Sequence, residues 1–214
     1  KFSLNRFLQS FPDIHIADSL LLRKGEALPA TADMVQRLGL PCFVKPNAGG
    51  SSFGVTKVKE KGALHAAIGK AMMESSEGMI ERMMSGTEIT CGCYRRPNGE
   101  IVTFPITEVV TTQEFFDYDA KYNGKVSEIT PARIAPETAE RVADTTRSIY
   151  RRLGCYGIIR IDYILTGEKG AEQINMLEIN TTPGMTATSF IPQQVRAAGL
   201  DIKDVLSEII EGKF

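Results

Sequence analysis

The sequence lacks several features that would assign it to a broad class at once. No apolar stretch approaches the roughly 20 residues that a membrane-spanning helix needs, and the N-terminus has no basic segment followed by an apolar core and a cleavage site. The 25 lysines and arginines are balanced by 26 aspartates and glutamates, so no overall positive field would attract nucleic acid or anionic lipid. We therefore expect a cytoplasmic protein that recognises its partners at a defined site.

Cysteines are also few, and their spacing fits neither a disulfide framework nor a zinc site. All four lie in apolar or strand-like stretches without CxxC spacing, and they are Cys42, Cys91, Cys93 and Cys155. Reduced thiols in the core are the better interpretation. Internal repeats and low-complexity tracts are absent as well, so the 214 residues predict one large domain or two small ones.

The pattern of apolar residues and turn signals predicts a mixture of helices and strands. Helical periodicity and capping residues predict helices over 4–11, 31–39, 64–72 and 136–154, and two short helices near the C-terminus. Strands are expected over 14–22, 41–45, 54–59, 78–84, 88–94, 100–110, 156–165 and 172–180. A polar, aromatic loop over 111–130 is too long to be a simple connector. The Ser85–Gly86 step is the best candidate for a domain boundary.

The segment KPNAGGSSFG at 45–54 joins a lysine to a loop of small residues. Backbone N–H groups of Gly49, Gly50, Ser51 and Ser52 could close over phosphates, while Lys45 supplies a positive charge. The loop is not a Walker A motif, because GxxxxGK[ST] is absent, and no GxGxxG follows a strand. Taken alone, it is equally compatible with an ordinary flexible hairpin.

Two strands near the C-terminus carry a second polar group. Strand alternation places Arg160 and Asp162 on one face, and likewise Glu178 and Asn180, and the turn at 166–170 brings Asp162 roughly opposite Glu178. Two opposed carboxylates repel each other. Mg²⁺ or Mn²⁺ would relieve the repulsion, because these cations prefer carboxylate and amide oxygens. The alternative is a solvated polar strand face without a metal.

Five segments resemble D-alanine–D-alanine ligases of the ATP-grasp superfamily in their order and spacing. They are VKPNAGGSSFGVTKV, IERMMSGTEIT, FFDYDAKY, LGCYGIIRIDYIL and MLEINTTPGMTATS, and together they extend the resemblance over nearly the whole chain. DYxAKY and ExNTxPGMTxxS are specific to this family, whereas the glycine loop and the acid pair support only the superfamily. The resemblance implies an α+β fold of two subdomains, 1–85 and 86–214, with mostly antiparallel sheets that hold ATP between them.

The same resemblance assigns ATP-binding roles to individual residues. Lys45 is similar to the family's phosphate-contacting lysine, Glu81 to its adenine-side acid and Glu88 to its ribose-binding acid. Further positions similar to ATP-contacting residues are Lys1, Ser51, Ser52, Met83, Met84, Phe115, Lys121, Ile164 and Leu177. Without the resemblance, Glu81 and Glu88 read as exposed acids on core strands, and Lys121 as an exposed loop residue.

Metal and substrate residues are implied in the same way. Asp162, Glu178 and Asn180 resemble the ligands of Mg²⁺ or Mn²⁺, of which two ions are expected. The implied catalytic residues are Arg160, which stabilises charge on the transferring groups, Gly184, whose N–H serves an oxyanion, and Ser51, Lys121 and Tyr122. Implied contacts to the substrate come from Tyr122, Arg160, Gly184, Ser189 and Phe190.

One of these residues has a simple structural alternative. The hydroxyl of Ser189 resembles the one that holds the carboxylate of the second substrate. Serine is also a favoured residue at the start of a helix, so Ser189 could instead only cap the helix that follows it.

The resemblance implies that the whole protein joins two D-alanines with ATP, through an acyl phosphate, for peptidoglycan precursors. It implies small-molecule substrates and is compatible with a homodimer. Alternatives are a ligase that joins D-alanine to another acceptor, or a non-catalytic nucleotide-binding module. Tyr122 favours a D-amino acid over D-lactate as the acceptor.

Three departures from the family pattern affect these expectations. Many relatives carry an acid where Gly49 stands and an aromatic hydroxyl where Phe116 stands. The chain also starts at Lys1 and does not contain the family's N-terminal domain. We therefore expect residues 1–214 alone to bind nucleotide without forming the dipeptide at a useful rate.

Overall fold

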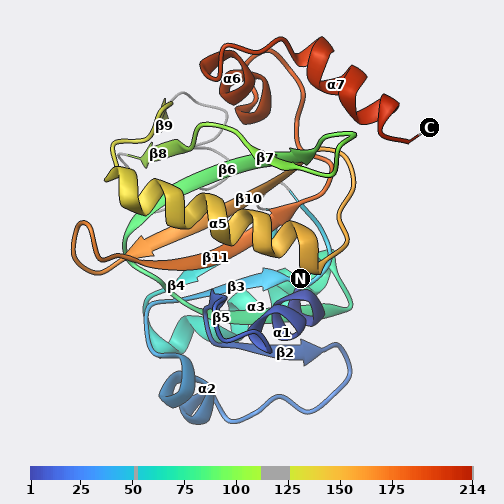
Figure 1. Ribbon diagram of the computed structural model, residues 1–214. Coiled ribbons are helices and arrows are strands. Elements are labelled where there is room, and N and C mark those ends of the chain that lie inside the picture. Colours follow the sequence, from blue (N-terminus) through green and yellow to red (C-terminus); the bar gives the residue numbers. More distant parts are fainter. Residues whose placement is uncertain (51–52, 112–125, 214) are drawn as a thin grey trace. The chain divides into compact units, whose positions relative to one another are not determined.

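The computed structural model describes residues 1–50, 53–111 and 126–213, and it divides the chain into two compact units (Figure 1). The first unit contains most of residues 1–85, and the second contains 12–15 and most of the chain from Gly86 onward. Every strand pair with a described register is antiparallel. The α+β class and the mostly antiparallel sheets predicted from the sequence are confirmed.

The first unit is built on a four-stranded sheet. The strand order is β2 (Ser19–Arg23), β5 (Glu77–Arg82), β3 (Cys42–Pro46) and β4 (Thr56–Val58). The helices of this unit are α1 (Phe2–Gln9), α2 (Thr31–Leu38) and α3 (Leu64–Glu74), the last preceded by a 3₁₀ turn at Lys61–Ala63. Apolar side chains of α2, α3 and the strands form one core: Leu22, Met34, Leu38, Cys42, Val44, Val58, Leu64, Ala67, Ile68, Ala71 and Ile80.

Strand alternation gives this sheet a second face with a different character. Val44 on β3 and Ile80 on β5 belong to the core under the helices. Their neighbours Lys45 and Glu81 therefore point to the opposite face. Because Phe43 pairs with Glu81 and Lys45 with Met79, the two charged residues are diagonal neighbours across the strand pair.

The second unit is built on a seven-stranded sheet. Its order is β1 (His15–Ile16), β11 (Gln173–Asn180), β10 (Ile159–Thr166), β6 (Thr87–Arg95), β8 (Thr107–Thr111) and β9 (Val126–Ile129), and β7 (Ile101–Thr103) also pairs with β6. Helix α5 (Pro136–Arg152) lies along one face of this sheet (Figure 1). The hydroxyl of Thr146 on α5 lies 2.7 Å from that of Tyr163 on β10, so the odd-numbered side chains around Tyr163 face α5.

Helix α6 (Phe190–Ala197) packs against the end of β6, and α7 (Ile202–Glu211) follows it. A Cβ at Gly92 would lie 2.4 Å from Cδ1 of Ile191, so only glycine allows α6 to come this close. The buried Gln194 amide donates to the carbonyl of Thr90 at 3.0 Å and accepts the N–H of Gly92 at 2.9 Å. These contacts hold α6 against β6 from Ile191 to Gln194.

The structure corrects three predictions of secondary structure. The apolar run at 14–22 is not one strand, because it divides into β1 and β2, which belong to different sheets. The run at 100–110 breaks into β7 and β8 around Pro105, which has no N–H to donate to a sheet. Strand β9 lies within the segment that was expected to be loop.

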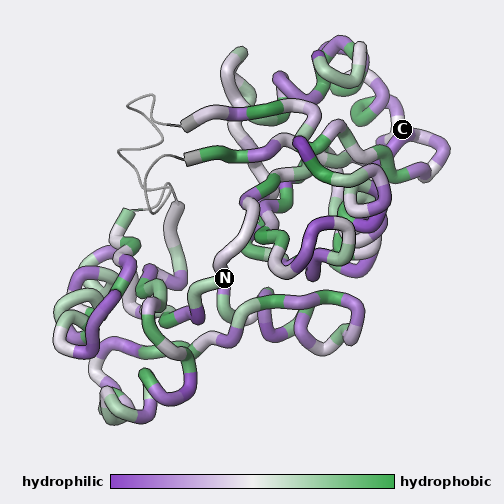
Figure 2. Tube along the Cα trace, turned by 90° about the vertical axis from the view of Figure 1, so that its left-hand side faces the viewer, coloured by the Kyte–Doolittle hydropathy of each residue, from purple (hydrophilic) through white to green (hydrophobic). Residues whose placement is uncertain are grey.

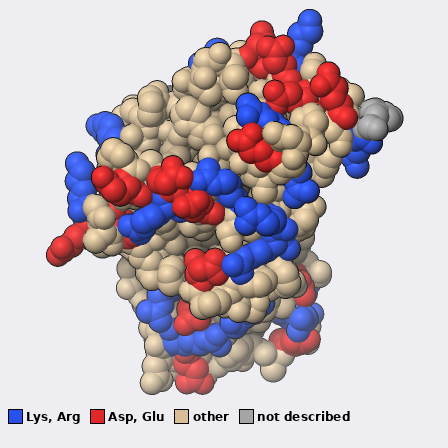
Figure 3. Space-filling model, in the orientation of Figure 1, with Lys and Arg blue, Asp and Glu red and all other residues tan. Residues whose placement is uncertain are grey.

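Hydropathy and charge are distributed as the composition predicts. Hydrophobic and hydrophilic residues alternate along the helices and strands (Figure 2), and among the described residues no helix is both long and apolar enough to cross a membrane. Lysines and arginines are interspersed with acids over α5 (Figure 3). There, Arg147 pairs with Glu140 and Asp144.

Candidate active site

Asp162 lies at the centre of a polar cluster on the sheet face that points away from α5. Its carboxylate accepts bonds of 2.8 and 2.9 Å from Nε and Nη2 of Arg160. The hydroxyl of Thr90 donates to Oδ1 at 2.6 Å, and Nδ2 of Asn180 donates to Oδ2 at 2.9 Å. In the backbone ladder between β10 and β11, Asp162 is opposite Glu178, and Arg160 is opposite Asn180. The predicted pairing of the two acids is therefore confirmed.

An irregularity in β11 accompanies this pairing. Asp162 is opposite Glu178, but the next residue, Tyr163, is opposite Met176, so Leu177 is an extra residue in the ladder. Such bulges turn a strand locally and change the direction of its side chains. The bulge thus separates the regular part of the hairpin from the segment that carries Glu178 and Asn180.

Arg160 balances the acids around it. Its guanidinium lies 5.0 Å from the ring centroid of Phe190, at the start of α6. Burial opposes the charge of Arg160, but the hydrogen bonds and charge of Asp162, with the charges of Glu178 and Glu88, outweigh it, so the pKa is raised. Arg160 thus already reduces the repulsion between the acids without a metal ion.

Glu88 belongs to the same sheet face, and its pKa is raised. Burial and, to a smaller extent, the charge of Asp162 raise the pKa of Glu88 to about 7, and Arg160 opposes this rise. Glu88 pairs with Ile164 in the ladder between β6 and β10. Just before it, a Cβ at Gly86 would lie 1.9 Å from the carbonyl oxygen of Leu165, so the chain needs glycine to enter β6 here.

The side chains on β10 and β11 form a donor set that suits a hard cation. Asp162, Glu178 and Asn180 offer carboxylate and amide oxygens, the ligands that Mg²⁺ prefers. Within the described part of the chain, no group of three or more histidines, cysteines or acids could hold a metal by itself. A cation at this place would therefore take further ligands from the Asn180 amide, water or phosphate. The amide would also have to turn, because it now presents Nδ2 to Asp162.

The first unit contains a separate charged pair. Nζ of Lys45 donates to Oε2 of Glu81 at 2.7 Å, and the side chains are only 12% and 3% exposed. Met83 and Met84, which follow β5, are half-buried. The structure thus brings Lys45 and Glu81, two of the predicted ATP-binding residues, into direct contact.

The base of the glycine loop is tied to α1. Oδ1 of Asn47 accepts the N–H of Phe2 at 2.8 Å, and Nδ2 of Asn47 donates to Glu77 on β5 at 2.6 Å. Lys1 directly precedes α1 and so lies beside the start of the loop. Gly49 has a φ of +126°, a region that favours glycine.

The loop before α6 brings together Gly184 and Ser189, two of the residues predicted to contact the substrate. Ser189 is the N-cap of α6, yet its side chain makes no capping hydrogen bond. Instead, its hydroxyl lies 2.7 Å from that of Thr186. A Cβ at Gly184 would lie 2.8 Å from Oγ of Ser189, so the backbone of Gly184 is next to this hydroxyl. The alternative that Ser189 only caps the helix is wrong.

Comparison with known proteins identifies the family. The family model described as "D-ala D-ala ligase C-terminus" matches residues 9–211. The chain belongs to this family. The family predicted from the five sequence segments is therefore confirmed.

Curated relatives in the family match this chain from end to end. D-alanine–D-alanine ligases of Bacteroides fragilis and Phocaeicola vulgatus are 62% and 63% identical over all 214 residues. The chain spans 64% of the length of each of these relatives.

Solved structures of related ligases share the fold. The VanG D-Ala:D-Ser ligase of Enterococcus faecalis superimposes with a TM-score of 0.86 at 30% identity, over 100% of this chain and 61% of that one. The D-alanine–D-alanine ligase of Bacillus anthracis complexed with ATP gives 0.79 at 28% identity, over 98% and 64%. The predicted ATP-grasp architecture is confirmed by these similarities.

Some predicted site residues lie outside the described part of the chain. These are Ser51 and Ser52 of the glycine loop, and Phe115, Lys121 and Tyr122 of the segment at 112–125, where Phe116, one of the departures from the family pattern, also lies. Among the described residues, Ile164 shares the sheet face of Asp162 by strand alternation. The roles of Ile164 and of the residues outside the described part toward a ligand remain predictions from the family resemblance.

Three residues of the site region were not singled out from the sequence. Thr90 orients Asp162, Gln194 anchors α6, and Thr186 contacts Ser189. Strand alternation gave a signal for Thr90, because it follows Glu88 by two residues and so shares its face. No comparable signal pointed to Gln194, since its partners lie about a hundred positions away in the sequence.

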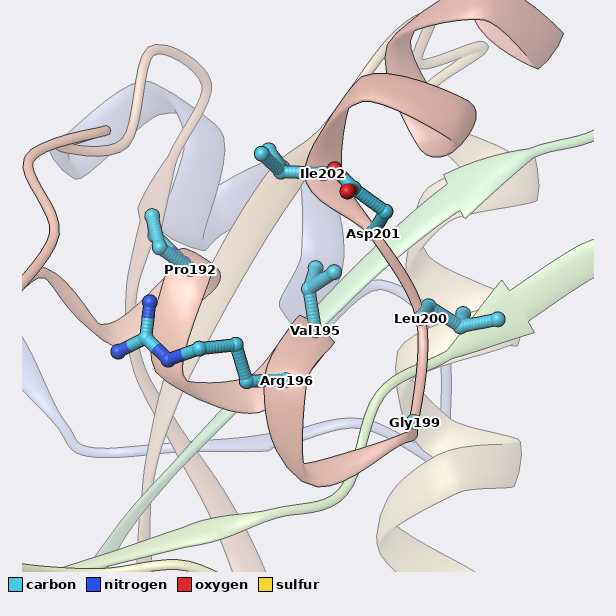
Figure 4. Close-up of a pocket in the computed structure, with 7 residues that line it drawn as sticks. All are labelled: Pro192, Val195, Arg196, Gly199, Leu200, Asp201 and Ile202. Atoms are coloured by element: carbon cyan, nitrogen blue, oxygen red, sulfur yellow. The ribbon is translucent and has the colours of Figure 1, made fainter.

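A surface hollow of about 430 Å³ lies elsewhere in the second unit. Figure 4 shows its lining on α6 and on the loop that leads to α7: Pro192, Val195, Arg196, Gly199, Leu200, Asp201 and Ile202. None of the predicted site residues lines it. We assign this hollow no part in the chemistry.

Proposed function

We propose that the complete protein joins two D-alanine molecules in an ATP-dependent reaction. The proposal rests on a polar cluster on the neighbouring strands β10 and β11, which consists of Arg160, Asp162, Glu178 and Asn180. The chain that carries this cluster is 62% identical to a D-alanine–D-alanine ligase. Because the chain spans 64% of that relative, the activity is proposed for the complete protein and not for residues 1–214 alone.

The reaction would proceed in two balanced steps. A carboxylate oxygen of the first D-alanine forms a bond to the γ-phosphorus of ATP, and the bond to the leaving oxygen of ADP breaks. The amine nitrogen of the second D-alanine then bonds to the acyl carbon and loses a proton, while inorganic phosphate leaves. Both steps move negative charge between oxygens, so cationic side chains are the main requirement.

The second unit would supply much of that positive charge. Arg160 stays charged, and it donates two hydrogen bonds to Asp162 that could be exchanged for bonds to phosphate or acyl oxygens. Asp162, Glu178 and Asn180 would hold Mg²⁺, which neutralises charge on phosphate oxygens when bound. With Asp162 engaged as a ligand, the guanidinium of Arg160 would be available to the reacting groups.

In the first unit, Lys45 and Glu81 would contribute to nucleotide binding. The ammonium of Lys45 is a compact charge suited to a phosphate oxygen, and Glu81 holds it in position before the nucleotide arrives. Glu81 is an acceptor for hydrogen bonds, and an exocyclic adenine amine is a matching donor. Met83 and Met84 would add apolar contacts nearby.

On the acceptor side, Ser189 and Gly184 would bind the second D-alanine. The Ser189 hydroxyl is not used by its own helix, so it can donate to a carboxylate. The backbone of Gly184 is next to that hydroxyl, and its N–H would serve the oxyanion that forms when the amine attacks.

A different acceptor is the second candidate, and one structural similarity favours it. The VanG protein, which matches this chain with a TM-score of 0.86, is named a D-Ala:D-Ser ligase. Product analysis with D-alanine, D-serine and D-lactate as competing acceptors separates the candidates. We expect the D-alanine dipeptide to predominate, and a larger yield of the mixed dipeptide or the ester would reject that choice of acceptor.

Loss of a carboxylate on β10 or β11 should weaken binding of Mg-ATP. Asp162→Asn and Glu178→Gln each remove one negative oxygen ligand at nearly constant shape, so affinity should fall by about tenfold or more. Isothermal titration calorimetry of the complete protein with a non-hydrolysable ATP analogue and Mg²⁺ measures this. Asp144→Asn, a matched change on the surface of α5, should leave affinity unchanged. Unchanged affinity in both site variants would reject the metal assignment.

A further inference from the structure

The hydroxyl of Ser189 does not make the hydrogen bond that is usual for a serine at the N-cap of a helix. A serine at this position normally accepts the N–H of the second or third residue of its helix. In α6 these residues are Ile191 and Pro192, and proline has no N–H. One of the two usual donors is therefore absent, and the side chain makes no capping bond.

Thr186 takes the place of the missing capping partner. Its Oγ1 lies 2.7 Å from Oγ of Ser189, and its carbonyl accepts the N–H of Ser189 at 2.8 Å. The two residues thus contact each other through both side chain and backbone. Gly184 leaves room on the other side, because a Cβ there would lie 2.8 Å from the serine oxygen.

The number of protons in this pair determines which hydroxyl donates. Each hydroxyl has one proton, and a carboxylate can only accept. When a carboxylate binds to Ser189, the serine proton must point at it, so the bond between the hydroxyls must run from Thr186 to Ser189. A donor on the serine oxygen also polarises its O–H and strengthens the bond that it gives.

We propose that Thr186 is a positioning residue that orients the Ser189 hydroxyl toward the carboxylate of the acceptor substrate. The inference rests on the proposed function, because it needs an acceptor with a carboxylate at Ser189. Thr186 itself is not a catalytic residue, since it acts through the serine. Pro192 assists by removing a competing donor within α6.

Thr186→Val in the complete protein tests the proposal, because it replaces the hydroxyl with a methyl group of similar size. We expect the KM for the acceptor D-alanine to rise about three- to tenfold, the usual effect of one hydrogen bond. The KM for ATP and kcat should stay unchanged, and Thr186→Ser should restore the acceptor KM. Thr188→Val, which removes a neighbouring exposed hydroxyl, is the matched control and should behave as wild type.

A double variant separates this inference from the proposed function. If Thr186 acts through the serine, Thr186→Val should add nothing further to the acceptor KM of Ser189→Ala. A raised KM in Ser189→Ala, together with a normal KM in Thr186→Val, would overturn the inference and leave the proposed function intact. Equal losses in kcat, ATP affinity and melting temperature in Thr186→Val would show a structural role and also overturn it. Wild-type protein that forms no dipeptide would overturn both.

Discussion

Arg160→Met in the complete protein should slow dipeptide formation by about a hundredfold to a thousandfold, the usual loss when one group that stabilises transition-state charge is removed. The methionine keeps much of the side-chain volume but cannot donate hydrogen bonds. Arg160 is the cation in contact with Asp162, and the charges of Glu178 and Glu88 also act on it. The loss of Arg160 removes the guanidinium that offsets the repulsion among these three acids. Steady-state release of phosphate from ATP, at saturating D-alanine, measures the effect.

The matched control for this variant is Arg147→Met. Arg147 is also paired with acids, Glu140 and Asp144, but it lies on α5, on the other face of the sheet. Its replacement should change the rate by less than about twofold, because surface ion pairs contribute little. An Arg160→Met enzyme with more than about half of the wild-type rate would show that this arginine does not stabilise the reacting groups.

Lys45→Met should destabilise the protein by about 3–5 kcal/mol, because it leaves the carboxylate of Glu81 buried without its cation. The Glu81 side chain is only 3% exposed, and Nζ of Lys45 is its partner at 2.7 Å. The same variant should bind ATP more weakly, since it removes a charge proposed to contact a phosphate. Urea unfolding of the protein without nucleotide measures stability, and calorimetry measures binding.

The double variant Lys45→Met with Glu81→Met distinguishes the two effects. Removing both charges should restore most of the stability, because apolar side chains can replace a buried ion pair, while ATP binding should stay weak. Arg23→Met, which disrupts an exposed pair with Glu77 in the same unit, should change stability little. A Lys45→Met protein as stable as wild type would contradict the account of the buried pair.

Local patterns predicted much of the site because strands and hairpins obey short-range rules. The period of two placed Arg160 beside Asp162 on one face, and the short turn at 166–170 brought Glu178 opposite Asp162. Helix α5 was delimited by Pro136 at its start and Gly154 just beyond its end, where φ is +59°. In each case the information lies within a few residues of the feature.

The remaining features depend on contacts between distant parts of the chain. The sequence gives no sign that Gln194 would reach the backbone of Thr90 and Gly92, or that Gly92 would make room for Ile191. Alternation could not show that the strand signal at 14–22 changes sheets, because both halves are similarly apolar. The contact between Arg160 and Asp162 follows from spacing, but its effect on the repulsion between the acids depends on side-chain conformation.

Product formation by the complete protein tests the central claim most directly. The purified complete protein is incubated with Mg-ATP and D-alanine, and ADP, phosphate and peptide are quantified together. The account predicts one D-alanyl-D-alanine for each ADP and phosphate, and no ATP consumption when D-alanine is omitted. ATP consumption that does not depend on D-alanine, or ATP binding without any dipeptide, would contradict it.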